Sequence, residues 1–167
     1  MRRVLLAARI PLVVLLLVAA ASPALAQRAV IVVRHAEKVD QSSDAVLSEA
    51  GHARARALAA LLAKAGVTAV YATQYQRTVQ TVQPLADALK LQVQTMPADD
   101  TASLVERLRT RHASNVVLVA GHSNTVPDIL NRLGHTETVT IPDDDFGNVF
   151  VVVPRPGGAP VVMRLRY

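Results

Sequence analysis

The sequence contains no cysteine and no tryptophan, and its only aromatic residues are three tyrosines and two phenylalanines. Without cysteine the chain cannot form disulfide bonds, and zinc sites that need thiolate ligands are excluded. The sequence has no H-E-x-x-H motif or comparable spacing, so a histidine zinc site is not expected either. Neither a basic stripe nor an aromatic platform is present, which disfavours nucleic acid as a partner. The sequence also lacks internal repeats and low-complexity linkers, and therefore predicts one domain.

The first 26 residues have the composition of a secretory signal peptide. Three arginines lead into an apolar run over residues 10–21, and the segment closes on Ala24-Leu25-Ala26, a small-x-small cleavage pattern. The apolar run is shorter than the roughly 20 residues that a membrane span requires. We therefore expect cleavage after Ala26 and a periplasmic or secreted protein with no membrane span, and retention as an anchor is the alternative.

Residues 27–167 then form the mature domain, long enough to bury a core of its own. The leader contains three arginines and no acid, so its removal lowers the net charge from +5 to +2. The high isoelectric point of the full chain therefore comes largely from the leader.

Strand and helix patterns alternate along this domain. Strands are expected at 29–33, 67–72, 91–95, 115–120, 148–153 and 161–166, and helices at 48–65, 75–89, 101–112 and 126–133. Ser48 is suited to cap the first helix and Gly66 to end it. The alternation predicts a three-layer α/β fold with a mainly parallel sheet flanked by helices. The last two strands, joined by residues 154–158, predict an antiparallel hairpin at one edge of the sheet.

Polar side chains follow three of these strands where each one ends. Arg34 and His35 come after the first strand, His122 follows the strand 115–120, and Arg77 lies in the first turn of the helix after the second strand. The carboxyl ends of parallel strands meet at one edge of the sheet, where helix N-termini also favour anions. Arginine binds two phosphate oxygens through its planar fork, and neutral histidine is a nucleophile at neutral pH. The pattern therefore predicts a phosphate-binding edge.

Four motifs in the chain resemble those of the histidine phosphatase superfamily, which includes phosphoglycerate mutases and acid phosphatases. The motifs are Arg34-His35-Ala36-Glu37, Leu47-Ser48-x-x-Gly51, Tyr71-Ala72-Thr73-x-x-x-Arg77-Thr78-x-x-Thr81 and Gly121-His122-Ser123-Asn124-Thr125. The resemblance implies that His35 is the nucleophile that becomes phosphorylated. It implies that Arg34, Arg77 and His122 hold the phosphoryl oxygens, that water hydrolyses the phosphohistidine, and that no metal or cofactor takes part.

The sequence departs from the family pattern at three positions near the site. Ala36 stands where the family usually has glycine, and Lys38 where the mutases have a small hydroxyl residue. Lys38 is expected either to contact phosphate or to be solvated. Thr78 follows Arg77 where the family often has alanine, and no role is predicted for its hydroxyl group.

The leaving group needs a proton donor, for which Asp100 is the first candidate and Asp99 and Glu37 are the others. An alternative of equal weight is that Asp99-Asp100 only caps the next helix. A phosphoramidate, or another good leaving group, would need less help from an acid.

The resemblance therefore predicts a metal-independent phosphatase that acts on phosphomonoesters or on phosphorylated envelope or protein substrates. The long insertions that build mutase and phytase substrate pockets are missing, which argues against a mutase and predicts an open site. A non-catalytic phosphate-binding or envelope interaction module is the alternative function.

Overall fold

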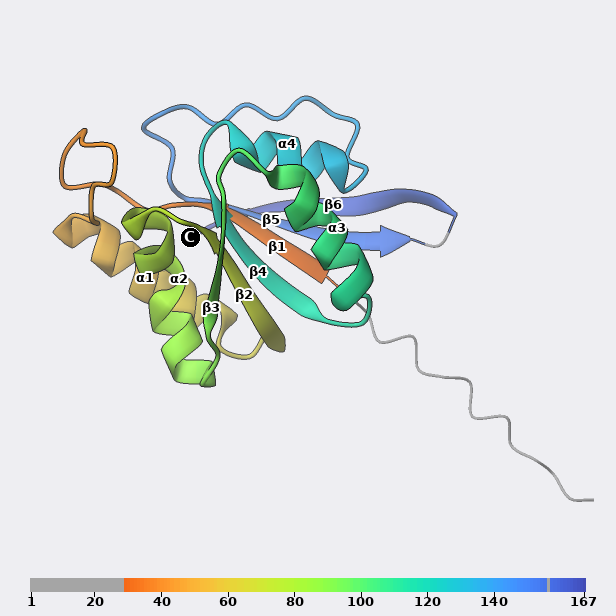
Figure 1. Cartoon of the computed structure of the whole chain (residues 1–167), viewed down its shortest axis with the longest axis horizontal. Coiled ribbons are helices and arrows are strands. Elements are labelled where there is room, and N and C mark those ends of the chain that lie inside the picture. Colours follow the sequence, from red (N-terminus) through yellow and green to blue (C-terminus); the bar gives the residue numbers. More distant parts are fainter. Residues whose placement is uncertain (1–28, 156) are drawn as a thin grey trace, which may run out of the picture.

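The computed structural model describes residues 29–155 and 157–167, which form a mixed six-stranded sheet between two pairs of helices (Figure 1). The predicted signal peptide lies outside the described residues. Of the helices in the described part of the chain, none has the length and apolar character that crossing a membrane requires.

The elements follow one another in the predicted alternation. The strands are β1 (Ala29–Arg34), β2 (Val67–Thr73), β3 (Val93–Met96), β4 (Val116–Gly121), β5 (Asn148–Arg155) and β6 (Gly158–Arg166). The helices are α1 (Glu49–Leu62), α2 (Gln76–Leu89), α3 (Thr101–Arg111) and α4 (Thr125–Arg132). The sheet order is β3-β2-β4-β1-β5-β6, with β1 to β4 parallel and with β5 and β6 antiparallel at one side. The predicted three-layer fold and its antiparallel strand pair are confirmed.

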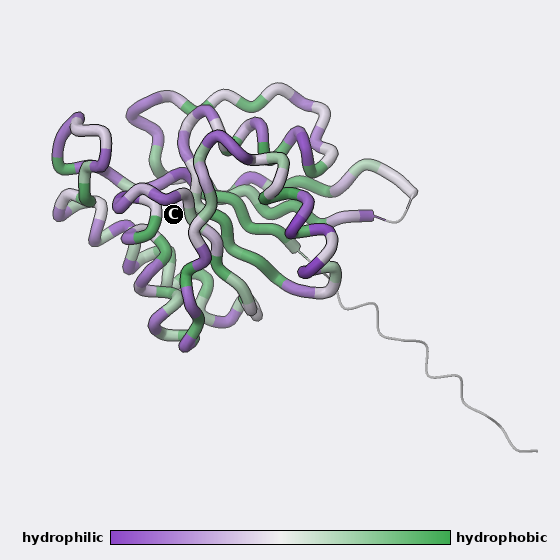
Figure 2. The backbone as a smooth tube through the Cα atoms, in the orientation of Figure 1, coloured by the Kyte–Doolittle hydropathy of each residue, from purple (hydrophilic) through white to green (hydrophobic). Residues whose placement is uncertain are grey.

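Both faces of the central strands are buried, which explains their continuous apolar sequences. Along β1, Val30 and Val32 pack toward α3 and α4, whereas Ile31 and Val33 pack toward α1 and α2. Figure 2 shows these strands as the hydrophobic centre of the molecule, with the hydrophilic segments outside. Burial of alternate residues on opposite faces holds the register of β1 in place, since a shift by one residue would exchange the two cores.

Local signals in the sequence set the ends of the first helix. Ser48 is the N-cap residue of α1, and its hydroxyl oxygen accepts a hydrogen bond of 3.1 Å from the Gly51 backbone N–H. Gly66, which has a φ of +74°, provides the left-handed turn between this helix and β2. The turn at Gly66 leads the chain directly into β2, whose carboxyl end contributes to the candidate active site.

Candidate active site

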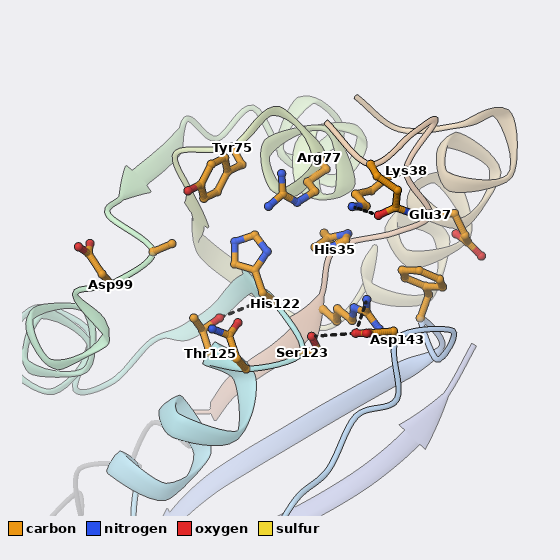
Figure 3. Close-up of a pocket in the computed structure, with 15 residues that line it drawn as sticks. His35, Glu37, Lys38, Tyr75, Arg77, Asp99, His122, Ser123, Thr125 and Asp143 are labelled. Carbon is orange, nitrogen blue, oxygen red and sulfur yellow. Dashed lines mark hydrogen bonds and ion pairs between the residues drawn. The ribbon is translucent and has the colours of Figure 1, made fainter. Parts of the chain in front are cut away.

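A cavity of about 690 Å³ lies at the carboxyl ends of the parallel strands (Figure 3). Segments that are distant in the sequence form its wall: the end of β1, the starts of α2 and α4, the loop before α3 and the loop before β5. The lining residues are Arg34, His35, Glu37, Lys38, Gln41, Tyr75, Arg77, Ala98, Asp99, His122, Ser123, Asn124, Thr125, Asp143 and Phe146.

The four residues predicted to bind and attack phosphate all line this cavity. Arg34, His35 and His122 are each less than 10% exposed, although their side chains are polar. The rings of His35 and His122 meet edge to face with their centroids 5.2 Å apart. Arg77 comes from the first turn of α2 and completes the group, as the parallel order of β1, β4 and β2 requires. The predicted convergence is therefore present in the structure.

The ring of His35 is oriented as a nucleophile would be. Its Nδ1 atom lies 2.7 Å from the Ala36 carbonyl oxygen, which can only accept, so Nδ1 carries the proton and donates. The unprotonated nitrogen is then Nε2. Burial, together with the positive charges of Arg34, Arg77 and Lys38, lowers the pKa of His35 to about 4, although the hydrogen bond to Ala36 acts in the opposite direction. His35 is therefore neutral at physiological pH.

The guanidinium group of Arg34 is held by the loop that precedes β5. Its Nη1 atom donates to the carbonyl oxygens of Pro142 at 2.6 Å and Asp145 at 3.4 Å, and the group lies 4.3 Å from the centre of the Phe146 ring. The carboxylate of Asp143 is 3.7 Å from Nη2 and is almost fully exposed. The buried Nε atom of Arg34 has no hydrogen-bond partner among the described residues.

Arg77 is held by the loop between β1 and α1. Its Nη1 atom donates to the Ser43 carbonyl oxygen at 2.8 Å, and its guanidinium group lies 4.4 Å from the centre of the Tyr75 ring. In the same loop, the Asp44 carboxylate accepts the backbone N–H of Gln76 and so caps α2 from outside the helix. The buried Nε atom of Arg77, like that of Arg34, has no hydrogen-bond partner within the described residues. Two guanidinium groups and two histidines that line one cavity are suited to a phosphate group.

His122 is fixed by two buried threonines that the sequence did not single out for this purpose. Its Nε2 atom lies 2.9 Å from the Thr73 hydroxyl oxygen, which is 2.8 Å from the Thr78 hydroxyl oxygen. Burial, together with the nearby groups His35, Arg77, Arg34 and Lys38, lowers the pKa of His122 to about 3. The departure from alanine at Thr78 was the available signal, but only the fold shows what its hydroxyl group contacts.

The candidates for the general acid lie in different surroundings. Asp100, the first choice, is the N-cap residue of α3, where it accepts from the Ser103 backbone N–H at 3.0 Å, and it is not among the residues that line the cavity. This hydrogen bond lowers the pKa of Asp100 and so favours the ionised form. Asp99, the next residue back, does line the cavity and is exposed.

Glu37 also lines the cavity but is paired with Arg54. The Nε and Nη2 atoms of Arg54 donate to the Glu37 carboxylate at 2.7–2.9 Å. Burial raises the pKa of Glu37, but the hydrogen bonds and charge of Arg54, a backbone hydrogen bond and nearby His35 together outweigh burial and lower it. Glu37 is therefore suited to hold the loop after His35 rather than to donate a proton.

The remaining cation at the rim is Lys38, whose Nζ atom donates to the Gln41 side-chain oxygen at 2.9 Å. It lines the cavity without a hydrogen bond to any of the four central residues. Among the described residues there is no group of three His, Cys, Asp or Glu side chains with the geometry of a metal site.

Comparison with known proteins gives one family. Residues 30–98 match the model of the histidine phosphatase superfamily (branch 1). The match contains the first three of the four motifs, and the fourth, at 121–125, lies beyond the matched residues. No curated protein matches the sequence.

Several solved structures share the fold of this chain. The protein histidine phosphatase SixA complexed with tungstate has a TM-score of 0.68 and 21% identity, over 83% of this chain and 96% of that chain. A phosphoserine phosphatase from Entamoeba histolytica, in complex with 3-phosphoglyceric acid, has a TM-score of 0.65 and 15% identity, over 84% and 97% of the two chains. A mycobacterial glucosyl-3-phosphoglycerate phosphatase has a TM-score of 0.65 and 12% identity, over 84% and 98%. At these identities the likeness establishes the fold.

Proposed function

The chain belongs to the histidine phosphatase superfamily, and from that premise we propose that it is a metal-independent phosphatase with His35 as its nucleophile. The observation that carries the proposal is the state of His35: a neutral, buried imidazole whose Nδ1 proton is held by the Ala36 carbonyl, beside Arg34, Arg77 and His122. The solved structures with this fold include a protein histidine phosphatase, a phosphoserine phosphatase and a glucosyl-3-phosphoglycerate phosphatase, which agrees with the proposal.

In the proposed reaction, the lone pair on His35 Nε2 forms a bond to phosphorus while the bond from phosphorus to the leaving group breaks. Arg34 and Arg77, which line the cavity beside His35, neutralise charge on the phosphoryl oxygens. Water then attacks phosphorus, the bond to Nε2 breaks, and inorganic phosphate leaves with His35 neutral again. Nothing in this scheme requires a metal ion, so excess chelator is expected to leave turnover unchanged.

The leaving group takes up a proton as it departs. We assign the role of proton donor to Asp99 because, among the described residues, it is the carboxyl group at the cavity wall without a hydrogen bond or an ion pair. Asp100 supports the neighbouring helix instead through its bond to the Ser103 backbone. The cavity opens to solvent at the sheet edge, which suits phosphomonoesters and phosphate groups carried on envelope molecules or proteins.

The decisive experiment is rapid quench with a labelled phosphomonoester. The intact chain should form an acid-labile, base-stable phosphoenzyme, and His35→Ala should form none and lose turnover by at least about 10⁴-fold, the effect of removing a covalent nucleophile. His52→Ala is the matched control, since His52 is exposed on α1 away from the cavity. Full turnover by His35→Ala would rule out the mechanism.

A phosphate-binding or envelope interaction module is the second candidate, and the position of Asp100 favours it. Asp100, the carboxyl group first predicted as the acid, is bonded to the backbone at the start of α3. The geometry therefore supports binding of an anion more directly than it supports protonation of a leaving group. Phosphate binding that is lost in Arg34→Ala, without turnover of any phosphoester in a broad panel, would identify the module.

We also propose that the protein is exported. The support is the composition of residues 1–26 and the cleavage pattern Ala24-Leu25-Ala26. Sequencing the N-terminus of protein from a periplasmic or secreted fraction should give Gln27. A membrane fraction that keeps Arg2 and Arg3 would instead show a retained anchor.

A further inference from the structure

The two threonines behind His122 form a hydrogen-bonded chain with a fixed direction. The Thr78 hydroxyl group lies 2.7 Å from the Tyr75 carbonyl oxygen, 3.0 Å from the Thr73 carbonyl oxygen and 2.8 Å from the Thr73 hydroxyl group. Carbonyl oxygens accept and cannot donate, so the single hydroxyl proton of Thr78 goes to a carbonyl. If the Thr73 hydroxyl donated to His122 instead, the two threonine oxygens would face each other at 2.8 Å with no proton between them, so the Thr73 hydroxyl donates to the Thr78 oxygen.

This direction decides which ring nitrogen of His122 carries the proton. Because the Thr73 hydroxyl proton is used on Thr78, the Thr73 oxygen can only accept from His122 Nε2, at 2.9 Å. The opposite direction would leave the Thr78 oxygen 2.7 Å from a carbonyl oxygen with no proton between them. Thr78 is fully buried, and Thr73 and His122 are each less than 10% exposed. Water therefore cannot readily replace the hydrogen bonds between them.

With Nε2 occupied, Nδ1 is the ring nitrogen that remains for a ligand. No hydrogen bond to Nδ1 is found among the described residues, and the ring lies between His35 and Tyr75, with centroids 5.2 Å and 5.4 Å away (Figure 3). The titratable and charged groups around the cavity that holds this ring are Arg34, His35, Glu37, Lys38, Tyr75, Arg77, Asp99 and Asp143.

We infer that Thr78, acting through Thr73, is a positioning residue that holds His122 in the tautomer with its proton on Nε2, so that Nδ1 meets the phosphoryl group as an acceptor. The inference deepens the proposed phosphatase function. An accepting Nδ1 atom pairs with the P–OH group of a phosphate monoanion and repels the lone pairs of the dianion. Nδ1 becomes a donor to the phosphoryl oxygen only after it takes that proton. The site is therefore selective for substrate that brings one proton on its phosphate.

The tautomer is tested directly by nitrogen-15 NMR of the histidine rings. His122 is assigned by loss of its signals in His122→Gln, and the protein without ligand should show a protonated Nε2 and an unprotonated Nδ1. In Thr78→Val, which keeps the shape and removes the hydroxyl, the Thr73 proton has lost its acceptor and turns to Nε2. The His122 proton should then move to Nδ1, and Thr78→Ser should restore the original tautomer.

The kinetic test uses the pH profile of kcat/KM for a phosphomonoester. The monoanion becomes about tenfold scarcer with each pH unit above the second phosphate pKa of about 6. The unmodified protein should therefore lose activity steeply from pH 7 to 8, whereas Thr78→Val should show a shallower decline and a rate at pH 6 that is about fivefold to tenfold lower, the effect of one lost hydrogen bond. Thr110→Val is the control, because Thr110 is exposed and its hydroxyl donates to the Glu106 carbonyl oxygen within α3, away from the cavity.

An Nδ1 proton on His122 in the unmodified protein would overturn the inference, and so would a Thr78→Val protein with unchanged tautomer and pH profile. The NMR measurement on the unmodified protein decides the matter even if Thr78→Val does not fold. A protein with the expected tautomer but no turnover would refute the proposed phosphatase function and leave the assignment of Thr78 standing.

Discussion

At the scale of single residues, this site depends on how each polar atom is already engaged before a ligand arrives. Histidine, arginine and aspartate side chains all line one cavity, yet their surroundings separate their chemistry. The Ala36 carbonyl fixes the Nδ1 proton of His35, and Arg54 keeps Glu37 ionised. From residue type alone, Asp99, Asp100 and Glu37 are equally good candidates for the general acid. Their hydrogen bonds distinguish them.

The first residue-scale prediction concerns the acid. Asp99→Asn should slow hydrolysis of an alkyl phosphate by about 10²-fold, the usual contribution of a general acid. With p-nitrophenyl phosphate, whose leaving group needs little protonation, the rate should change much less. The measurement is kcat for the two substrates in parallel.

Asp100→Asn is the matched control for this prediction. Asparagine caps helices as well as aspartate does, so α3 and the melting temperature should be preserved. If Asp100→Asn shows the leaving-group dependence and Asp99→Asn does not, the assignment of the acid must be reversed.

At the scale of elements, helix α1 is docked against the loop that carries the nucleophile. A Cβ atom at Gly51 would lie 2.2 Å from the Glu37 carbonyl oxygen, and the Ser48 N–H bonds the same oxygen at 2.9 Å. A backbone oxygen held in this way cannot rotate aside as a side chain could. The first turn of α1 therefore fixes the chain two residues beyond His35.

Gly51→Ala should destabilise the protein and impair the site together. Alanine in a helix normally gains about 1 kcal/mol over glycine, but overpacking against backbone costs about 1–3 kcal/mol and more where no shift relieves it. We expect a lower urea midpoint and a lower kcat. Gly158→Ala is the control, because a Cβ there meets nothing within 4 Å. Unchanged stability in Gly51→Ala would show that the loop is free to move.

The elements themselves were largely predictable, and their assembly much less so. The apolar runs of β1 and β4, the Ser48 cap and the turn at Gly66 are local patterns, and the structure confirms them. The strand order depends on pairing between strands that are not consecutive in the sequence, and the contacts of Arg34 with Pro142 and Asp145 join residues more than 100 positions apart. The convergence of Arg34, His35, Arg77 and His122 was predictable because parallel strands share one carboxyl edge. The threonine pair was not, since its meaning comes from distances to carbonyl oxygens.

At the scale of the whole molecule, the fold keeps two histidines neutral, and the free energy of unfolding therefore decreases in acid. Burial lowers the pKa of His35 to about 4 and that of His122 to about 3, both from an ordinary value of 6.5. The unfolded chain therefore binds more protons than the folded chain once the pH falls below 6.5. Linkage then requires the free energy of unfolding to fall as the pH drops from 6.5 toward 4.

The pH range of this loss of stability separates it from the titration of carboxyl groups. Each histidine contributes at most about 1.4 kcal/mol per pH unit within that window. Burial also lowers the pKa of His112, which adds to the same slope. Hydrogen bonds from Arg166 and Asn148 lower the pKa of Asp145 to about 2, but an aspartate loses its stabilising effect only below its ordinary value near 4.

The last prediction follows from the pH ranges in which the histidines and the carboxyl groups affect stability. Urea unfolding at pH 7 and pH 5 should give a clearly smaller free energy at pH 5, and the double variant His35→Gln, His122→Gln should show a shallower pH dependence because glutamine does not titrate. His52→Gln, at an exposed position, serves as the control for the substitution itself. A double variant that loses stability between pH 7 and pH 5 as steeply as the unmodified protein would mean that neither histidine is held neutral by the fold. The argument for His35 as a nucleophile that is unprotonated at physiological pH would then lose its physical basis.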